Sequence, residues 1–167
     1  KPWYVEQVLK NRDFRADDTI VSVAAGLSLA ALREWAGDAP NIIRSMPNTP
    51  CTIGRGVTGI FGGYGAPLAL ARELFESVGA VVELGREEQF NGLTAISGSG
   101  PAYVFTIIEA LADGGVLMGL DRQTARSLAI ETLVGSAMYA GASDVHTAEL
   151  KDRVASPGGT TIAALRE

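Results

Sequence analysis

The sequence contains a single cysteine and a single histidine among its 167 residues. Cys51 has no partner for a disulfide within the chain, which is typical of a protein from a reducing cytoplasm. Metal centres of the zinc type need several His or Cys ligands, so no metal site is predicted. We expect Cys51 to be a small buried side chain and His146, beside Asp144, to lie exposed at a helix start.

The sequence also lacks a basic cluster and an uninterrupted hydrophobic run. Its 14 Lys and Arg against 19 Asp and Glu give a net charge of −5, and neither the part before Ile96 nor the part after it is basic. Nucleic acids and anionic membranes are therefore not expected as partners. The longest uncharged stretch, residues 89–108, contains glycines and Pro101, which argue against a membrane span. No signal-peptide core is present, so we expect a cytoplasmic protein.

Familiar catalytic motifs are missing as well. There is no G-x-G-x-x-G after a predicted strand, no phosphate-binding loop ending in Gly-Lys-Ser/Thr and no nucleophile elbow. Glycine, in contrast, is abundant: 20 of 167 residues, about 12% against a usual share of roughly 7%. That much glycine predicts tight turns and close backbone approaches.

The first part of the chain predicts alternating helices and strands. Short apolar, partly β-branched runs favour four strands, at residues 19–25, 41–46, 57–61 and 80–84. Amphipathic patterns favour three helices, at residues 3–11, 29–36 and 66–78, the second capped by Ser28 and ended by Gly37. This alternation predicts an α/β unit with a largely parallel sheet.

The second part predicts long helices only. Residues 101–118 are apolar on nearly every face, so this helix is expected to be buried all round. Asp121 is a good N-cap for a helix that reaches Ala140 and stops at Gly141. Small residues recur along it in two rows, Ala125, Ala129, Leu133 and Ala137, and Thr132, Ser136 and Ala140. We infer that this part packs against a second copy; a monomer whose long helices cover each other is the alternative.

Two glycine-rich stretches precede apolar helical patterns. Residues 97–101 (SGSGP) fit turns and caps. Residues 156–161 (SPGGTT) place Gly158 and Gly159 before two β-branched hydroxyl residues, a combination that suits a backbone approached by an anion at a helix N-terminus. From the residues alone, a plain turn and a small-anion site both stay open. Glu87 and Glu88, a pair of charged residues between predicted elements, are expected to lie in a solvated loop.

Taken together, motifs along the whole chain resemble the pyrroline-5-carboxylate reductase family. The matching segments, in order and with matching spacing, are Lys1-Pro2, residues 23–26 (VAAG), 46–50 (MPNTP), 97–103 (SGSGPAY), 112–115 (ADGG) and 150–161 (LKDRVASPGGTT).

The resemblance implies an oxidoreductase that reduces pyrroline-5-carboxylate to proline with NADPH or NADH, the last step of proline biosynthesis. It implies a Rossmann-type dinucleotide-binding unit, here partial and covering residues 1–90, and an all-α dimerisation and substrate domain over residues 91–167. Two copies would form a homodimer through the helical domains; a larger assembly stays open.

The resemblance also assigns site residues by position. Thr161 would be catalytic, offering its hydroxyl to the ring nitrogen. The implied substrate-binding residues are Glu87, Val154, Ser156, Gly158, Gly159, Thr160 and Thr161. The implied cofactor-binding residues are Lys1, Pro2, Val23, Ala24 and Ala25.

The sequence departs from the family in what it lacks. Members begin with a strand, a Gly-rich turn and a helix that hold the pyrophosphate, and none of these precedes Lys1. We therefore expect the chain as written to be an incomplete piece that is not competent without that segment. Two alternatives remain: a catalytically inactive, reductase-like dimerisation module, and a related Rossmann dehydrogenase acting on another small imine or hydroxy acid.

Overall fold

The computed structural model describes residues 1–166, which fall into two compact units, Lys1–Tyr103 and Val104–Glu167. Each unit is described by itself. The domain boundary expected after residue 90 stays a prediction, and the contacts themselves group residues 91–103 with the first unit.

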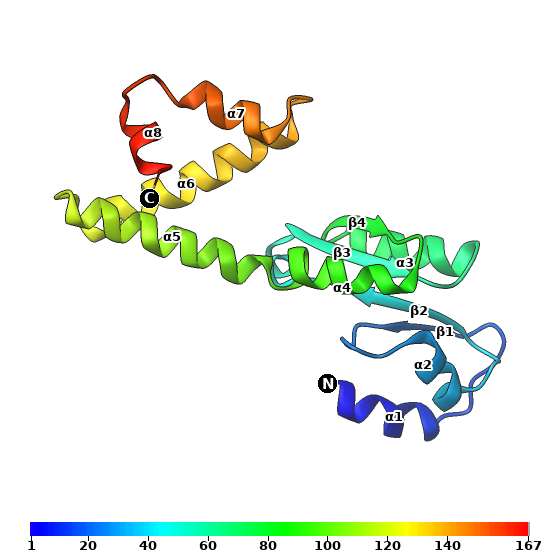
Figure 1. The fold of residues 1–167 in the computed structure, drawn as a ribbon. Coiled ribbons are helices and arrows are strands. Elements are labelled where there is room, and N and C mark those ends of the chain that lie inside the picture. The colour runs from blue at the N-terminus through cyan, green and yellow to red at the C-terminus, as the bar shows by residue number, and fades with distance from the viewer. Residues whose placement is uncertain (167) are drawn as a thin grey trace. The chain divides into compact units, whose positions relative to one another are not determined.

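A four-stranded sheet forms the centre of the first unit (Figure 1). Its strands lie in sequence order: β1 (Thr19–Ser22), β2 (Asn41–Met46), β3 (Gly56–Phe61) and β4 (Gly79–Glu83). β1 pairs with β2 and β3 with β4 in parallel, as predicted, but β2 and β3 are antiparallel. The chain reaches β3 through a short 3₁₀ turn, η1 (Thr49–Ile53). Parallel pairing needs a crossover of a dozen or more residues, and residues 47–55 are too few to make one.

Helices cover both faces of this sheet. Neighbouring residues of a strand point to opposite faces, so Ile42 and Ile43 of β2 enter different clusters. Ile43 packs with Ile60 and the helix α3 (Ala66–Glu76). Ile42 packs with Leu9 of α1 (Pro2–Lys10) and Leu32 of α2 (Leu29–Ala36). The three predicted helices are confirmed, including the Ser28 cap, whose hydroxyl accepts a hydrogen bond from the Ala31 N–H at 3.1 Å.

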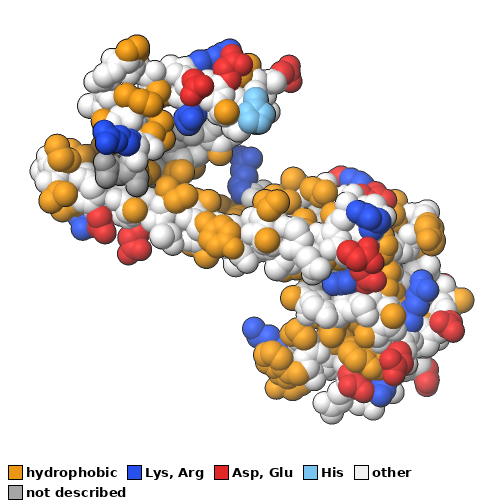
Figure 2. All heavy atoms as spheres, in the orientation of Figure 1, with side chains coloured by type: hydrophobic (Ala, Val, Ile, Leu, Met, Phe, Trp, Pro, Cys, Tyr) orange, Lys and Arg blue, Asp and Glu red, His pale blue; other side chains and the backbone are white. Residues whose placement is uncertain are grey.

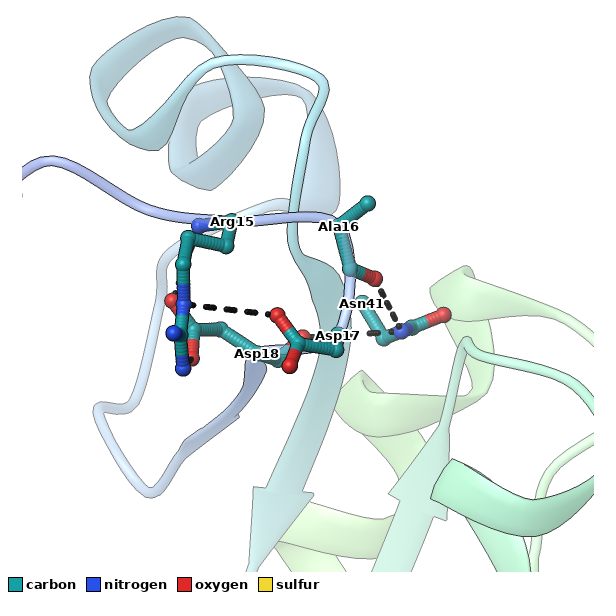
Figure 3. Close-up of polar contacts among 5 residues, drawn as sticks. All are labelled: Arg15, Ala16, Asp17, Asp18 and Asn41. Atoms are coloured by element: carbon teal, nitrogen blue, oxygen red, sulfur yellow. Dashed lines mark hydrogen bonds and ion pairs between the residues drawn. The ribbon is translucent and has the colours of Figure 1, made fainter.

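A polar turn leads into β1 and fixes where that strand starts (Figure 3). The Asp18 carboxylate accepts from the Arg15 N–H at 2.8 Å, while its backbone carbonyl accepts from the Asn41 N–H at 2.9 Å. The Asn41 side chain also donates to the Ala16 carbonyl at 3.4 Å. The turn therefore aligns the first residues of β1 and β2.

The chain then becomes helical from Glu87 onwards. A 3₁₀ turn, η2 (Glu87–Gln89), passes into α4 (Phe90–Leu93), a π-turn η3 (Thr94–Gly98) and α5 (Gly100–Leu117). The Ser99 N–H donates to the Thr94 carbonyl at 2.8 Å, five residues back. The prediction of turns and caps at residues 97–101 holds only in part: Gly98 ends the π-turn and Ser99 is a bend, whereas Gly100 and Pro101 are already the first residues of α5. A proline in the first turn of a helix loses no hydrogen bond, because that N–H has no partner within the helix.

Three further helices follow α5 among the described residues of the second unit: α6, α7 and the short α8. α6 (Arg122–Gly141) begins as predicted at Asp121, whose side chain accepts from the N–H groups of Gln123 and Thr124, both at 3.0 Å. α7 (Thr147–Val154) begins after His146, which is exposed and accepts from the Ala148 N–H at 3.2 Å, in line with its predicted place. α8 (Thr160–Ala164) follows residues 155–159.

The core of the second unit is small and built largely of alanine. Ala112 of α5 packs against Ala125 and Ala129 of α6, and a Cβ on Gly115 would lie 3.0 Å from that of Ala125. Of the predicted first row, Ala125 and Ala129 form the α5–α6 contact, whereas Ala137 is exposed. Within one chain Ala112 is the one buried residue of α5, so the predicted burial on every face is not provided by a single copy.

Large apolar side chains therefore cover the surface of α5, visible as orange patches in Figure 2. The exposed ones are Tyr103, Val104, Phe105, Ile107, Leu111 and Leu117. One helical run, Glu87–Leu117, is long and apolar enough for a membrane span, with a mean hydropathy of 1.2. Length and composition alone are weak evidence for such a span.

Candidate functional site

A hollow of about 470 Å³ opens at the carboxyl end of β1 in the first unit. Its lining includes all five residues expected to touch a dinucleotide: Lys1, Pro2, Val23, Ala24 and Ala25. Ligands of α/β sheets bind outside the carboxyl ends of the parallel strands, where the loops diverge. The structure therefore brings the five predicted cofactor residues together in one hollow, which β1, α1, α2 and the loop after β1 line. Their role in binding a dinucleotide stays a prediction.

The rim of this hollow is a loop after β1. The strand ends at Ser22, earlier than the predicted Ala25, so residues 23–28 form a connection to α2. We call residues 23–28 the cofactor loop. Gly26 turns the chain with a φ of 78°, a left-handed conformation that a side chain would strain. The Ala24 N–H donates to the Ser22 hydroxyl at 3.4 Å, and the small side chains of Ala24 and Ala25 leave backbone at the opening.

Glu87 lies in the first unit and is held by two donors. Its Oε1 accepts from the Leu29 N–H and from Arg44 Nη1, both at 2.6 Å. The expectation of a solvated loop is therefore wrong for Glu87, whose side chain is 27% exposed, although Glu88 is exposed. A substrate-binding role for Glu87 stays a prediction.

The glycine-rich segment near the C-terminus forms a tight turn before α8. The Gly159 N–H donates to the Ser156 carbonyl at 3.0 Å, with Pro157 and a left-handed Gly158 (φ 69°) between them. This is the geometry of a type II turn. A Cβ on Gly159 would collide with the Ser156 hydroxyl. The left-handed backbone of the turn therefore accounts for Gly158, so the pair of glycines does not by itself indicate a ligand site.

Beyond the turn, the predicted substrate residues stay within the second unit. Thr160 and Thr161 are the first residues of α8, with Thr160 exposed and Thr161 half-buried. Val154, at the end of α7, is 68% exposed and lines a separate hollow of about 260 Å³. Its other lining residues are Ser136, Tyr139, Ala140, Thr147, Leu150 and Lys151. Among residues 1–166, no group of three His, Cys, Asp or Glu could hold a metal ion.

Comparison with known proteins decides the family. The crystal structure of the Plasmodium falciparum pyrroline carboxylate reductase with NADP bound superposes with a TM-score of 0.91 and 34% identity, over 99% of this chain and 68% of that one. A family model, pyrroline-5-carboxylate reductase dimerisation, matches residues 87–167. The chain belongs to the pyrroline-5-carboxylate reductase family.

Sequence relatives of this reductase-family chain agree with that assignment. The pyrroline-5-carboxylate reductase of Synechocystis sp. is 44% identical over 99% of the chain and 62% of the relative. That of Arabidopsis thaliana is 47% identical over 89% of the chain and 54% of the relative. The chain thus spans less than two thirds of the length of these two relatives.

Sequence reasoning missed two polar residues that organise the first unit, Arg44 and Asn48. Arg44 lies in the middle of β2, 12% exposed, with its guanidinium 4.3 Å from the centre of the Phe90 ring. Asn48 follows β2 and hydrogen bonds to both Val57 and Ser97. For Arg44 the available signal was an arginine directly after the apolar pair Ile42 and Ile43 of a predicted strand, because a buried guanidinium requires an anionic partner. The second depends on a contact between distant segments.

Proposed function

We propose that the full-length protein is a cytoplasmic pyrroline-5-carboxylate reductase, reducing this cyclic imine to proline with NADPH or NADH in proline biosynthesis. The observation that carries the proposal is the single hollow at the end of β1. Five residues chosen by family position alone line it together. The apolar lining suits the ring faces of a dinucleotide, and the backbone beside Ala24 and Ala25 leaves room for close approach.

The chemistry divides between cofactor and protein. The dinucleotide supplies the hydride, and the protein supplies binding, orientation and electrostatics. In this proposal Lys1, Pro2 and residues 23–25 hold the dinucleotide. The substrate carboxylate would be held by the backbone of Gly159, Thr160 and Thr161, with Val154, Ser156 and Gly158 lining the pocket.

Thr161 is the proposed catalytic residue. An aliphatic hydroxyl is too weak an acid to protonate an imine outright. Its role is to orient the ring nitrogen by donating a hydrogen bond, and to pass on a proton taken from water.

The proposed partner is a second copy of the chain, bound through the helices of the second unit. Support comes from the apolar side chains that α5 exposes in a single chain and from the dimerisation model matched by residues 87–167. A hollow of about 550 Å³ between α5 and α6 gives that face a shape a partner can fill. It is lined by apolar residues (Phe105, Ile108, Ala112 and Ile130) and by charged ones (Glu109, Arg122 and Arg126).

The test is loss of NADPH absorbance when the full-length protein meets pyrroline-5-carboxylate. We expect turnover, and we expect Thr161→Val to reduce it about a hundredfold with cofactor affinity unchanged. Thr161→Ser keeps the hydroxyl and serves as the control. Equal losses of turnover and cofactor affinity would reject the role of Thr161. No turnover from a well-folded dimer would favour the inactive dimerisation module.

A further inference from the structure

We propose that Glu87 is a positioning residue that anchors the cofactor loop, and that it acts on the dinucleotide rather than on the substrate. The inference rests on the proposed function, because it assigns the loop a cofactor to bind. It differs from the role that family resemblance implies for Glu87, and the contacts of the first unit carry it.

The anchor is a hydrogen bond between segments far apart in the sequence. Glu87 Oε1 accepts from the N–H of Leu29 at 2.6 Å, across 58 positions of the chain. Leu29 is the first residue of α2 and follows the cofactor loop directly. An N–H in the first turn of a helix has no partner within the helix, and a carboxylate there is also favoured by the helix dipole. Glu87 therefore fixes the point where the loop ends.

Glu87 is itself held in place from the other side. Arg44 donates to the same Oε1 at 2.6 Å and lies over the ring of Phe90, which is 5% exposed. Arg44 extends from β2, the strand next to β1. Charge-assisted hydrogen bonds of this kind are the strong ones. The carboxylate thus ties the loop to the sheet and to the start of the helical run.

Two residues at the far end of the loop have contacts of their own: Leu27 packs against the cluster of Leu9, Leu32 and Ile42, and Ser28 caps α2. The rim of the loop has less to hold it, so its place depends on that far end. Gly26 has a left-handed backbone, and Val23, Ala25 and Gly26 are exposed. Its first residues are joined to β1 by the 3.4 Å contact of Ala24 with Ser22. Releasing Leu29 would let the far end move, and with it the three residues that rim the hollow. Loss of the anchor should therefore weaken cofactor binding, while the rate of the chemical step near Thr161 stays the same.

The experiment compares Glu87→Ala with Glu88→Ala in the full-length protein. Glu88 is the exposed neighbour in the same turn, so the control removes the same charge without the anchor. For Glu87→Ala we expect the KM for NADPH to rise about tenfold, with kcat at saturating NADPH within about twofold and the KM for pyrroline-5-carboxylate unchanged. Glu87→Gln keeps an oxygen acceptor for the Leu29 N–H but removes the charge that pairs with Arg44, so it should recover only part of the loss.

Amide hydrogen exchange of peptides spanning residues 23–32 measures how firmly the loop is held, independently of catalysis. Exchange should accelerate in Glu87→Ala and stay at the wild-type rate in Glu88→Ala. If Glu87→Ala does not fold, Glu87→Asp, whose shorter side chain cannot reach both donors, should show the same changes. Unchanged exchange, or a raised KM for pyrroline-5-carboxylate with an unchanged KM for NADPH, overturns the inference. A wild-type protein without turnover refutes the proposed function instead, and the exchange data still decide the anchor.

Discussion

Asn48 joins the motifs at residues 46–50 and 97–103 by donating from Nδ2 to the Ser97 carbonyl at 3.1 Å. Its Oδ1 accepts from the Val57 N–H at 2.8 Å. Pro101, four residues after Ser97, has no N–H to donate to that carbonyl, which is left open by the helix. One amide therefore satisfies a strand N–H and a helix carbonyl that would otherwise be unpaired.

The first prediction follows from this bridge. Asn48→Ala should lower the free energy of unfolding by about 2 to 3 kcal/mol, because a half-buried N–H and a carbonyl lose their partner. Chemical denaturation followed by circular dichroism measures it. Asn91→Ala, at an exposed position of α4, is the matched control and should change stability by less than about 0.5 kcal/mol. Equal effects of the two substitutions would contradict the bridge.

The second prediction concerns the pair of glycines at the start of β3 and β4. Gly56 and Gly79 lie opposite each other, and a Cβ on Gly79 (φ 151°) would come within 2.6 Å of the Gly56 nitrogen. Backbone cannot yield as a flexible side chain does, so Gly79→Ala should cost about 3 kcal/mol or more. Gly92→Ala meets nothing within 4 Å and should be neutral or slightly stabilising. A Tm for Gly79→Ala equal to that of Gly92→Ala would refute the close approach.

The third prediction is a pH dependence at the start of α6. Hydrogen bonds from the Thr124 hydroxyl and the Thr124 and Gln123 N–H groups lower the pKa of Asp121 from its ordinary value of 3.8. A lowered native pKa means that the stabilisation is complete above the ordinary value and is lost as the pH falls through the native one. Wild type should therefore exceed Asp121→Asn in denaturation midpoint at pH 7, with the gap closing below pH 3.8. A gap that widens in acid would contradict the lowered pKa.

The fourth prediction addresses the apolar face of α5. Phe105 is 62% exposed in one chain. If a second copy covers it, Phe105→Glu should weaken the dimer by about 3 kcal/mol, roughly a hundredfold in Kd. Leu70→Glu is the control, because Leu70 is a similarly exposed apolar residue on α3 of the first unit. Light scattering should find a monomer for Phe105→Glu and a dimer for Leu70→Glu; a dimer in both cases places the interface elsewhere.

Local patterns in the sequence predicted the helices and strands well. Apolar runs located all four strands, and Ser28 and Asp121 marked helix starts where their side chains now accept backbone N–H groups. These features depend on neighbours a few residues away. The position of the cofactor residues was available only through family resemblance, since alanine and valine carry no chemistry of their own.

Features that depend on contacts between distant segments could not be predicted from local sequence patterns. The apolar run of β3 does not show that this strand pairs antiparallel with β2. The short connection between the two strands, residues 47–55, was the feature that could have predicted it. Residues 97–101 were predicted as turns because glycine and proline disfavour helices. The hydrogen bond from Asn48 to the Ser97 carbonyl comes from a distant segment and could not be predicted from the local pattern. Glu87 looked solvated because its two donors, Leu29 and Arg44, lie far away in the sequence.

The alanine core between α5 and α6 has a consequence for how the protein behaves on dilution. Ala112, Ala125 and Ala129 bury little apolar area, so the second unit draws little stability from within one chain. If its exposed side chains are covered by association, folding of this unit is coupled to protein concentration by mass action. The Tm should then climb as the protein is concentrated, and dilute samples should be cut by proteases in α6 and α7 before the sheet is attacked.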